Sequence, residues 1–152
     1  MARNVLHCIH GVNGLVVAVG ENGKILHFEG ERCEPREVMS PTQATLRSVW
    51  VESPSCAWAI GDGVTLRWDG EVWQEIPIET TDAILGACLM DDELWVTTER
   101  GEVYRHDGRR WWLEARGAFG ALRSICAVDG VLWCAGDEGV VIQHLPEEDG
   151  CP

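Results

Sequence analysis

The sequence lacks long apolar runs and lacks any stretch with the 3.6-residue period of an amphipathic helix. Nothing in it approaches the roughly 18 consecutive apolar residues of a membrane-spanning helix. Residues 1–4 lead directly into a strand-like segment, without the apolar core of a signal peptide. We therefore expect a cytoplasmic protein with no membrane partner, in a chain long enough for one domain with a substantial core.

The cysteines lack the spacing of a metal site or a redox motif. There are seven, an odd number, and no CxxC occurs. Most lie within apolar strand patterns, where cysteine behaves as a small hydrophobic residue. We expect all of them to be reduced thiols and expect no cofactor. They are Cys8, Cys33, Cys56, Cys88, Cys126, Cys134 and Cys151.

Positive charge is also scarce. The chain has 12 Lys and Arg against 25 Asp and Glu, a formal net charge of −13. Without a concentrated basic patch, such a chain repels phosphate backbones, and direct nucleic-acid binding is not expected. The charge indicates a solvated surface that keeps an apolar repeat soluble. An acidic face for a basic protein partner is the alternative.

The sequence does contain four copies of a unit of about 38 residues. The clearest copy runs from Leu46 to Ile76 and reads as four short apolar strands, LRSVWV, CAWAI, VTLRW and EVWQEI, joined by tight turns. The last copy stops after its third strand, and an acidic tail follows at 147–152. The predicted repeat bounds are about 5–40, 45–80, 84–117 and 121–146.

Equivalent positions keep the copies in register. Asp69-Gly70 and Asp107-Gly108 are dipeptides that accept a positive φ in a hairpin turn. Thr98 replaces a turn glycine in the third copy. Leu6, Leu46, Leu85 and Leu122 are predicted to begin the first strands, and Val17, Trp58, Trp95 and Trp133 share one position in the second strands.

A four-strand sheet with apolar residues on both faces must pack against neighbours, as blades do in a β-propeller. From about Leu6 to His144 the pattern resembles the repeats of bacterial β-propeller proteins, with L-x-x-V-W, W-A-V-G-x-x-G and W-D-G-x-x-W motifs. The resemblance implies an all-β propeller and says little about function. Four blades can close round their own axis, two chains can form an eight-blade homodimer ring, or a different propeller chain can complete the ring.

No catalytic motif accompanies the repeat. We find no nucleophile elbow, phosphate-binding glycine loop or HExxH helix. Asp91-Asp92-Glu93 reads as a solvated hairpin tip. In His7-Cys8-Ile9-His10, Cys8 and His10 share one strand face, but a zinc site would need two further ligands. We expect neither an enzyme nor a metal site.

Several side chains are candidates for contacts. One third-strand position is polar in every copy and is expected to bridge neighbouring blades, an anion-binding ring being the alternative. Trp58, Trp95 and Trp133 are predicted to lie in the core, whereas Trp50 and Trp112 break the repeat pattern and are candidate partner contacts. The polar position holds His27, Arg67, Arg105 and Gln143.

The missing outer strand of the last copy predicts an open sheet edge from Val140 through Ile142 to His144, to which a partner strand can add. Because a rigid scaffold without catalytic residues suits binding, we interpret the chain as a non-enzymatic protein-interaction or scaffold module. A carbohydrate-binding, lectin-like propeller is the alternative. A propeller hydrolase would need axial carboxylates, and the first strands supply almost none.

Overall fold

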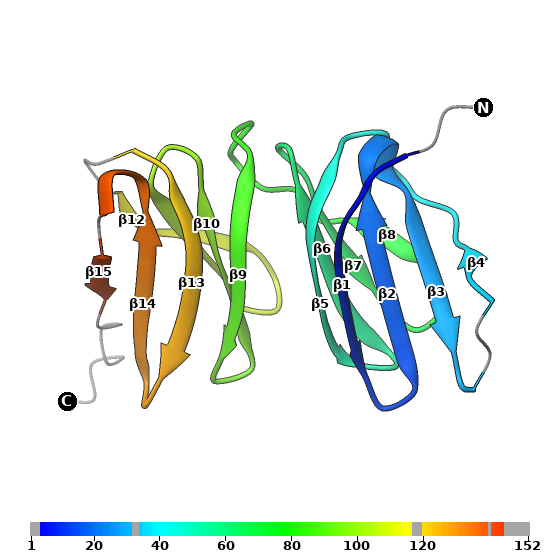
Figure 1. The fold of residues 1–152 in the computed structure, drawn as a ribbon. Coiled ribbons are helices and arrows are strands. Elements are labelled where there is room, and N and C mark those ends of the chain that lie inside the picture. Colours follow the sequence, from blue (N-terminus) through cyan, green and yellow to red (C-terminus); the bar gives the residue numbers. More distant parts are fainter. Residues whose placement is uncertain (1–3, 32–33, 117–119, 140, 145–152) are drawn as a thin grey trace. The chain divides into compact units, whose positions relative to one another are not determined.

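Each sequence repeat forms one antiparallel sheet in which consecutive strands are neighbours (Figure 1). The computed structural model describes residues 4–31, 34–116, 120–139 and 141–144. The first sheet, blade 1, contains β1 (Leu6–Val12), β2 (Leu15–Gly20), β3 (Ile25–Glu29) and β4 (Arg36–Glu37). Blade 2 contains β5 (Leu46–Ser53), β6 (Cys56–Gly61), β7 (Thr65–Trp68) and β8 (Trp73–Glu75).

The second half of the chain repeats the arrangement. Blade 3 contains β9 (Ile84–Met90), β10 (Glu93–Thr98), β11 (Glu102–His106) and β12 (Trp111–Arg116). Blade 4 contains β13 (Leu122–Val128), β14 (Val131–Gly136) and β15 (Val141–His144), and its sheet has three strands within the described residues. Two single 3₁₀ turns, Glu21–Gly23 and Asp137–Gly139, connect strands. The predicted all-β propeller fold is confirmed.

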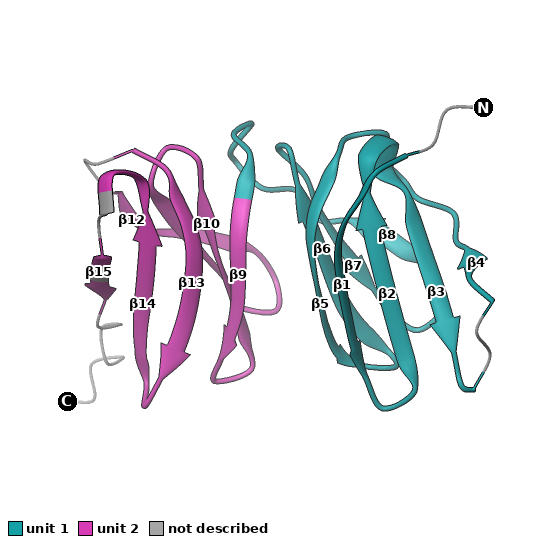
Figure 2. Ribbon diagram, viewed as in Figure 1, with its two compact units in different colours: residues 1–84 teal, residues 85–152 magenta. Residues whose placement is uncertain are grey.

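The chain comprises two compact units, residues 1–84 and residues 85–152 (Figure 2). The first unit holds blades 1 and 2, and the second holds blades 3 and 4 from just after the start of β9. The single domain expected for residues 1–152 stays a prediction. In the described part of the chain, no helix is long and apolar enough to cross a membrane.

Each unit has its own core between two blades. We call the side of blade 1 that carries Cys8, Val17 and Ile25 its forward face and the opposite side its rear face. Equivalent residues define the same faces in the other blades. In the first unit, the forward face of blade 1 packs against the rear face of blade 2, which contributes Val49 and Leu66. In the second unit, the forward face of blade 3 packs likewise against the rear face of blade 4.

The structure corrects the register of the third repeat by one residue. The first strand of blade 3 begins at Ile84, which is fully buried like Leu46, and not at Leu85. Gly86 then takes the place of Cys8, and a Cβ built on it would lie 3.2 Å from the Cα of Ser124 in blade 4. The sequence comparison matched leucine to leucine, whereas burial selects whichever aliphatic residue points into the core.

Candidate interaction surfaces

The first strands of blades 1 and 2 meet through side chains of the HCIH segment. The Sγ of Cys8 lies 3.9 Å from the Oγ of Ser48, and the Nδ1 of His10 accepts a 2.8 Å hydrogen bond from the backbone N–H of Val51. Cys8 and His10 therefore share a strand face, as predicted. Both side chains contact residues of blade 2, so they take part in the packing between blades 1 and 2.

The contact between the same two blades continues outward to a buried histidine. His27 of β3 is fully buried, and its Nε2 lies 3.0 Å from the Nε1 of Trp73 in β8. An indole N–H can only donate, so Nε2 is the acceptor and neutral His27 carries its proton on Nδ1. This Nδ1 has no hydrogen-bond partner within the described residues. His27 thus links blade 1 to blade 2.

Protonation of His27 should weaken this link. Burial lowers the pKa of His27 below its ordinary value of 6.5, and the nearby Arg36 lowers that pKa further, while Glu29 opposes the shift. The protonated ring would also direct a second N–H at the Trp73 donor. In the unfolded chain His27 takes up its proton near pH 6.5, whereas the folded chain does so only at lower pH.

The contribution of His27 to stability should therefore be complete above about pH 6.5 and should fall as pH decreases from there toward the folded-state pKa. Urea denaturation between pH 5 and 7 measures the effect. The reference is His27→Gln, which lacks the titrating ring. If both proteins lose stability equally over this range, His27 does not titrate as inferred.

The other residues at the polar third-strand position contact their own blades. Arg105 forms ion pairs with Glu93 and Glu114 of blade 3. Burial opposes the charged form of the Arg105 guanidinium, but the two carboxylates together outweigh burial and raise its pKa. The Arg67 guanidinium lies 5.3 Å from the ring centre of Trp58 in blade 2. Gln143 pairs with Trp133 across β14 and β15 and is exposed. His27 thus bridges two blades, whereas the contacts named for Arg105, Arg67 and Gln143 join described residues of one blade.

The two tryptophans proposed as contacts differ in exposure. Trp50 is half-buried, and its ring stacks on His10 with 4.9 Å between ring centres. Trp112 is 39% exposed, but Arg110 lies 3.5 Å from its ring centre and its Nε1 donates to Asp107. A sugar ring would have to displace these neighbours. These two aromatic faces therefore give the carbohydrate-binding alternative no specific support.

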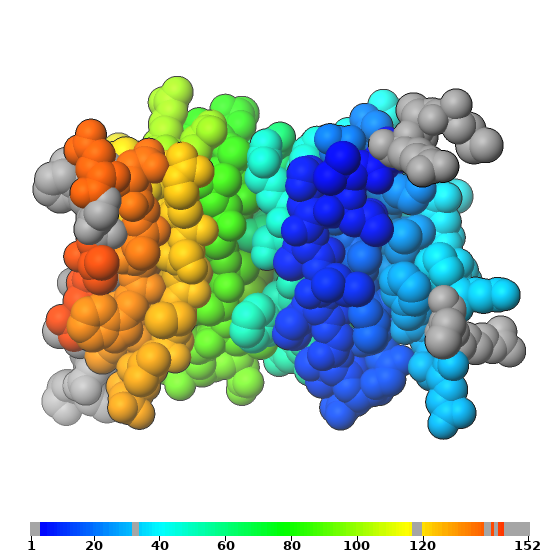
Figure 3. Space-filling view, in the orientation of Figure 1, coloured from blue at the N-terminus to red at the C-terminus, as the bar shows by residue number. Residues whose placement is uncertain are grey.

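Blade 1 presents an uncovered rear face. Ile9 is 62% exposed, whereas Val49, its equivalent in blade 2, is 4% exposed because blade 1 covers it. Leu6 is 45% exposed, while the equivalent Leu46 is fully buried. Figure 3 shows the residues of β1 at the surface of the first unit. The exposed aliphatic side chains occupy positions that a neighbouring blade covers elsewhere in the repeat.

Blade 4 presents the complementary surface, its forward face. Trp133 is 41% exposed, which corrects the prediction that it lies in the core with Trp58 and Trp95. The equivalent Trp95 is 3% exposed because it packs in the contact between blades 3 and 4. Aligning the repeats identifies Trp133 as a residue that would pack against the next blade. Within its described residues the second unit contains no further blade after blade 4, so no next blade of that unit covers Trp133.

The outer strand of blade 4 within the described residues is β15. It pairs with β14 from Ala135↔Val141 to Leu132↔His144, and the described sheet ends there. His144 is half-buried and its ring centre lies 5.9 Å from that of Trp95. Val140 and the predicted tail at 147–152 lie outside the described residues. The backbone of Ile142 belongs to β15.

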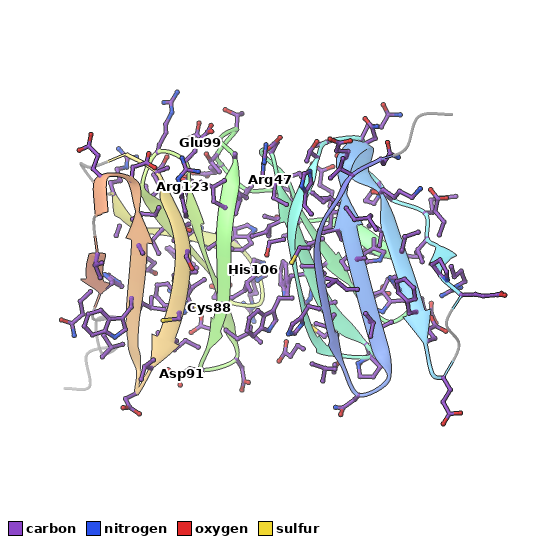
Figure 4. All side chains as sticks on the ribbon, viewed as in Figure 1. Arg47, Cys88, Asp91, Glu99, His106 and Arg123 are labelled. Atoms are coloured by element: carbon purple, nitrogen blue, oxygen red, sulfur yellow. The ribbon has the colours of Figure 1, made fainter. Side chains whose placement is uncertain are left out.

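One repeated feature was missed from the sequence. An acidic residue follows the last second-strand position in all four copies, and in two copies an arginine just after the first-strand leucine binds it: Arg47 with Asp62, and Arg123 with Asp137. The hydrogen bond from Arg123 lowers the pKa of Asp137. In the second unit, Figure 4 shows Arg123 and Glu99 at the end of the strands opposite Asp91. The acidic residue that follows the second strand in every copy was the available signal.

Reactive chemistry is sparse on these surfaces. Within the described residues, no group of three His, Cys, Asp or Glu side chains could hold a metal ion. Asp91 and Asp92 are exposed at positive φ in the β9–β10 turn. An open recess of about 460 Å³ lies between the hairpin ends of blades 1 and 2, but Trp68 in its wall is buried.

The thiols should differ in reactivity. Burial raises the pKa of Cys88 to about 12 and that of Cys134 to about 11, whereas Cys126 is exposed. We expect a thiol reagent at pH 8 to label Cys88 and Cys134 only slowly in the folded protein, because the thiolate is the nucleophile. The unfolded chain should titrate all seven thiols without reductant. A count of three or fewer titrated thiols would contradict the prediction that the cysteines are reduced. Fast labelling of Cys88 would contradict its burial.

Comparison with solved structures supports the fold. The computationally designed Ika4 protein aligns over 95% of this chain and 93% of its own, with 12% identity and a TM-score of 0.79. The designed Ika8 protein aligns over 91% and 45%, with 13% identity and a TM-score of 0.75. YCF48 bound to D1 peptide aligns over 95% and 52%, with 19% identity and a TM-score of 0.72.

The chain thus spans nearly all of Ika4 and about half the length of Ika8 and of YCF48. No protein-family model matches the sequence, and no curated protein matches it. At these identities the similarity shows the fold alone.

Proposed function

We propose that this chain is a non-enzymatic protein-interaction module that takes up an extended segment of a partner protein at the outer edge of β15. The observation that carries the proposal is the shape of the sheets: three blades have four strands, and the described sheet of blade 4 has three. A partner strand there would complete the repeat and satisfy outward-facing backbone N–H and C=O groups.

Two further observations support this proposal. YCF48, which has a similar fold, is known in a structure with a bound D1 peptide, and this supports peptide binding as a function to test in this chain. The edge is also apolar on one side, since Val141 is 66% exposed. Side chains at alternate positions of an added strand can pack against such a surface and give the contact specificity.

The test uses the alternation of backbone groups along an antiparallel edge. Successive residues of β15 direct their N–H groups alternately toward β14 and away from it. In Ile142→Pro and Gln143→Pro, one variant loses an N–H bonded to β14 and the other loses an outward N–H. Hydrogen exchange of the wild-type chain identifies the bonded amide, because it exchanges slowly.

Affinity capture from the native host with the wild-type chain should recover a stoichiometric partner. The variant without the outward N–H should keep the wild-type urea midpoint and lose most of that partner, whereas the other should be less stable. Recovery of nothing besides the chain itself counts against an interaction module. Equal partner recovery by the stable proline variant counts against the β15 edge.

A further inference from the structure

The two uncovered end faces are the complementary halves of one repeated contact. Within each unit, a forward face packs on a rear face. Blade 4 leaves a forward face uncovered, with Val141 66% exposed where the equivalent Val103 is buried, and blade 1 leaves a rear face uncovered around Ile9. Of the ten large hydrophobic residues exposed in the described chain, seven belong to the first and last repeats: Val5, Leu6, Ile9, Met39, Val128, Trp133 and Val141.

Both end faces carry little charge on their first two strands; on the rear face of blade 1 the charged residue Glu37 stands on the outer strand β4. On the forward face of blade 4, Ser124, Cys126 and Ala135 accompany Trp133 and are all exposed. The rear face of blade 1 carries Ile9 and Gly11 in β1, with Val16 in β2. In a chain with a net charge of −13, two faces with so little charge on their first two strands stand out as surfaces made for contact.

The angle between blades 1 and 2 indicates how many blades the complete assembly contains. Their contact begins at Cys8 and Ser48 on the first strands and still holds at His27 and Trp73, which belong to the third and fourth strands. Strands lie about 4.8 Å apart, so the third strand is about 10 Å farther out than the first.

Sheets splayed at about 90°, as in a four-blade ring, would separate by about 14 Å more at the third strand than at the first. At about 45°, as in an eight-blade ring, the added separation is about 8 Å. A histidine, a tryptophan and one 3.0 Å hydrogen bond cannot span the larger gap. The contact between blades 1 and 2 therefore fits sheets splayed by about 45° better than sheets splayed by about 90°.

We infer that the occupant of each end face is a second copy of this chain. The forward face of blade 4 in one copy covers the rear face of blade 1 in the other, and two-fold symmetry repeats the contact. Two such contacts leave no end face open, which favours a closed dimer over an extending polymer. Two chains then contribute eight blades, within the range of known propellers.

Light scattering after size exclusion, from about 1 to 50 µM chain, tests this directly. The expected mass is twice the 16.8 kDa of one chain. A compact monomer at all concentrations would mean that the chain covers its own end faces, and a mass that grows beyond the dimer would mean open association. Either result overturns the inference.

Two variants locate the interface. Ile9→Asp and Trp133→Asp each place a charge on one end face and should yield folded monomers, whereas Val72→Asp, at a 50% exposed residue just before β8 of blade 2, should remain dimeric. Mixing the two monomers should restore a dimer, because one of its two contacts is then fully wild type. If both variants stay dimeric, or if the mixture stays monomeric while each variant has a wild-type circular dichroism spectrum, the proposed faces are wrong. Should a variant fail to fold, the wild-type mass still decides between dimer and monomer.

Discussion

Replacing Trp95 with Ala should lower the free energy of unfolding by about 3–5 kcal/mol, the usual cost of removing a buried tryptophan. Trp95 is 3% exposed and packs with Cys88 and Leu132 in the core of the second unit. Removing the indole leaves a cavity between two sheets whose backbones are fixed by their own hydrogen bonds, so collapse can fill it only in part. Urea denaturation followed by circular dichroism measures the loss.

Trp112→Ala is the matched control, since it removes the same side chain from a 39% exposed site in the same blade. It loses the contact with Arg110 and the hydrogen bond to Asp107. These surface interactions are worth about 1 kcal/mol or less each. Equal urea midpoints for Trp95→Ala and the wild-type chain would contradict the packing of blades 3 and 4.

The blades could be predicted from the sequence because the same pattern of strands and turns occurs in four copies. Each strand needs an apolar position at the same place, and each hairpin needs a residue that accepts positive φ, as Gly70 and Gly108 do. Such local requirements can be recognised from the type of residue at each position. One register error arose where two adjacent aliphatic residues, Ile84 and Leu85, both suit the position, and only burial distinguishes them.

The candidate sites were less predictable because they depend on what lies beside a residue. Trp95 and Trp133 occupy the same repeat position, yet one is buried by the next blade and the other is exposed. His27 and Arg105 are also equivalent, but His27 reaches Trp73 of the following blade while Arg105 is held by carboxylates of its own blade. A histidine ring fits a buried interface as a neutral group, whereas a guanidinium keeps its charge and needs counter-ions.

Gly61 shows a requirement that residue type alone misrepresents. Gly61 is the turn glycine at the repeat position that Thr98 takes in the third copy, but its φ is not positive, unlike that of its neighbour Gly63. A Cβ built on Gly61 would lie 2.0 Å from the backbone oxygen of Thr45 and 2.8 Å from the Cα of Leu46. The glycine is needed because the chain entering β5 crosses directly over the end of β6.

Gly61→Ala should therefore destabilise the protein by about 3 kcal/mol or more. Overpacking against atoms that cannot rotate away costs roughly 1–3 kcal/mol. The shift of Thr45 also breaks its 3.0 Å hydrogen bond from the N–H of Asp62, worth about 1 kcal/mol. Gly136→Ala should behave alike in the second unit, because its Cβ would lie 1.9 Å from the oxygen of Ala121.

Gly14→Ala separates this steric effect from backbone strain. Gly14 has a φ of +90°, and a Cβ there would meet no atom within 4 Å. Its substitution should cost only about 1–2 kcal/mol, the penalty of a left-handed conformation for an L-residue. Urea midpoints of the three alanine variants give the comparison. If Gly61→Ala is no less stable than Gly14→Ala, the close approach of Thr45 to β6 is not a constraint on the fold, and the glycine at the end of β6 serves the turn alone.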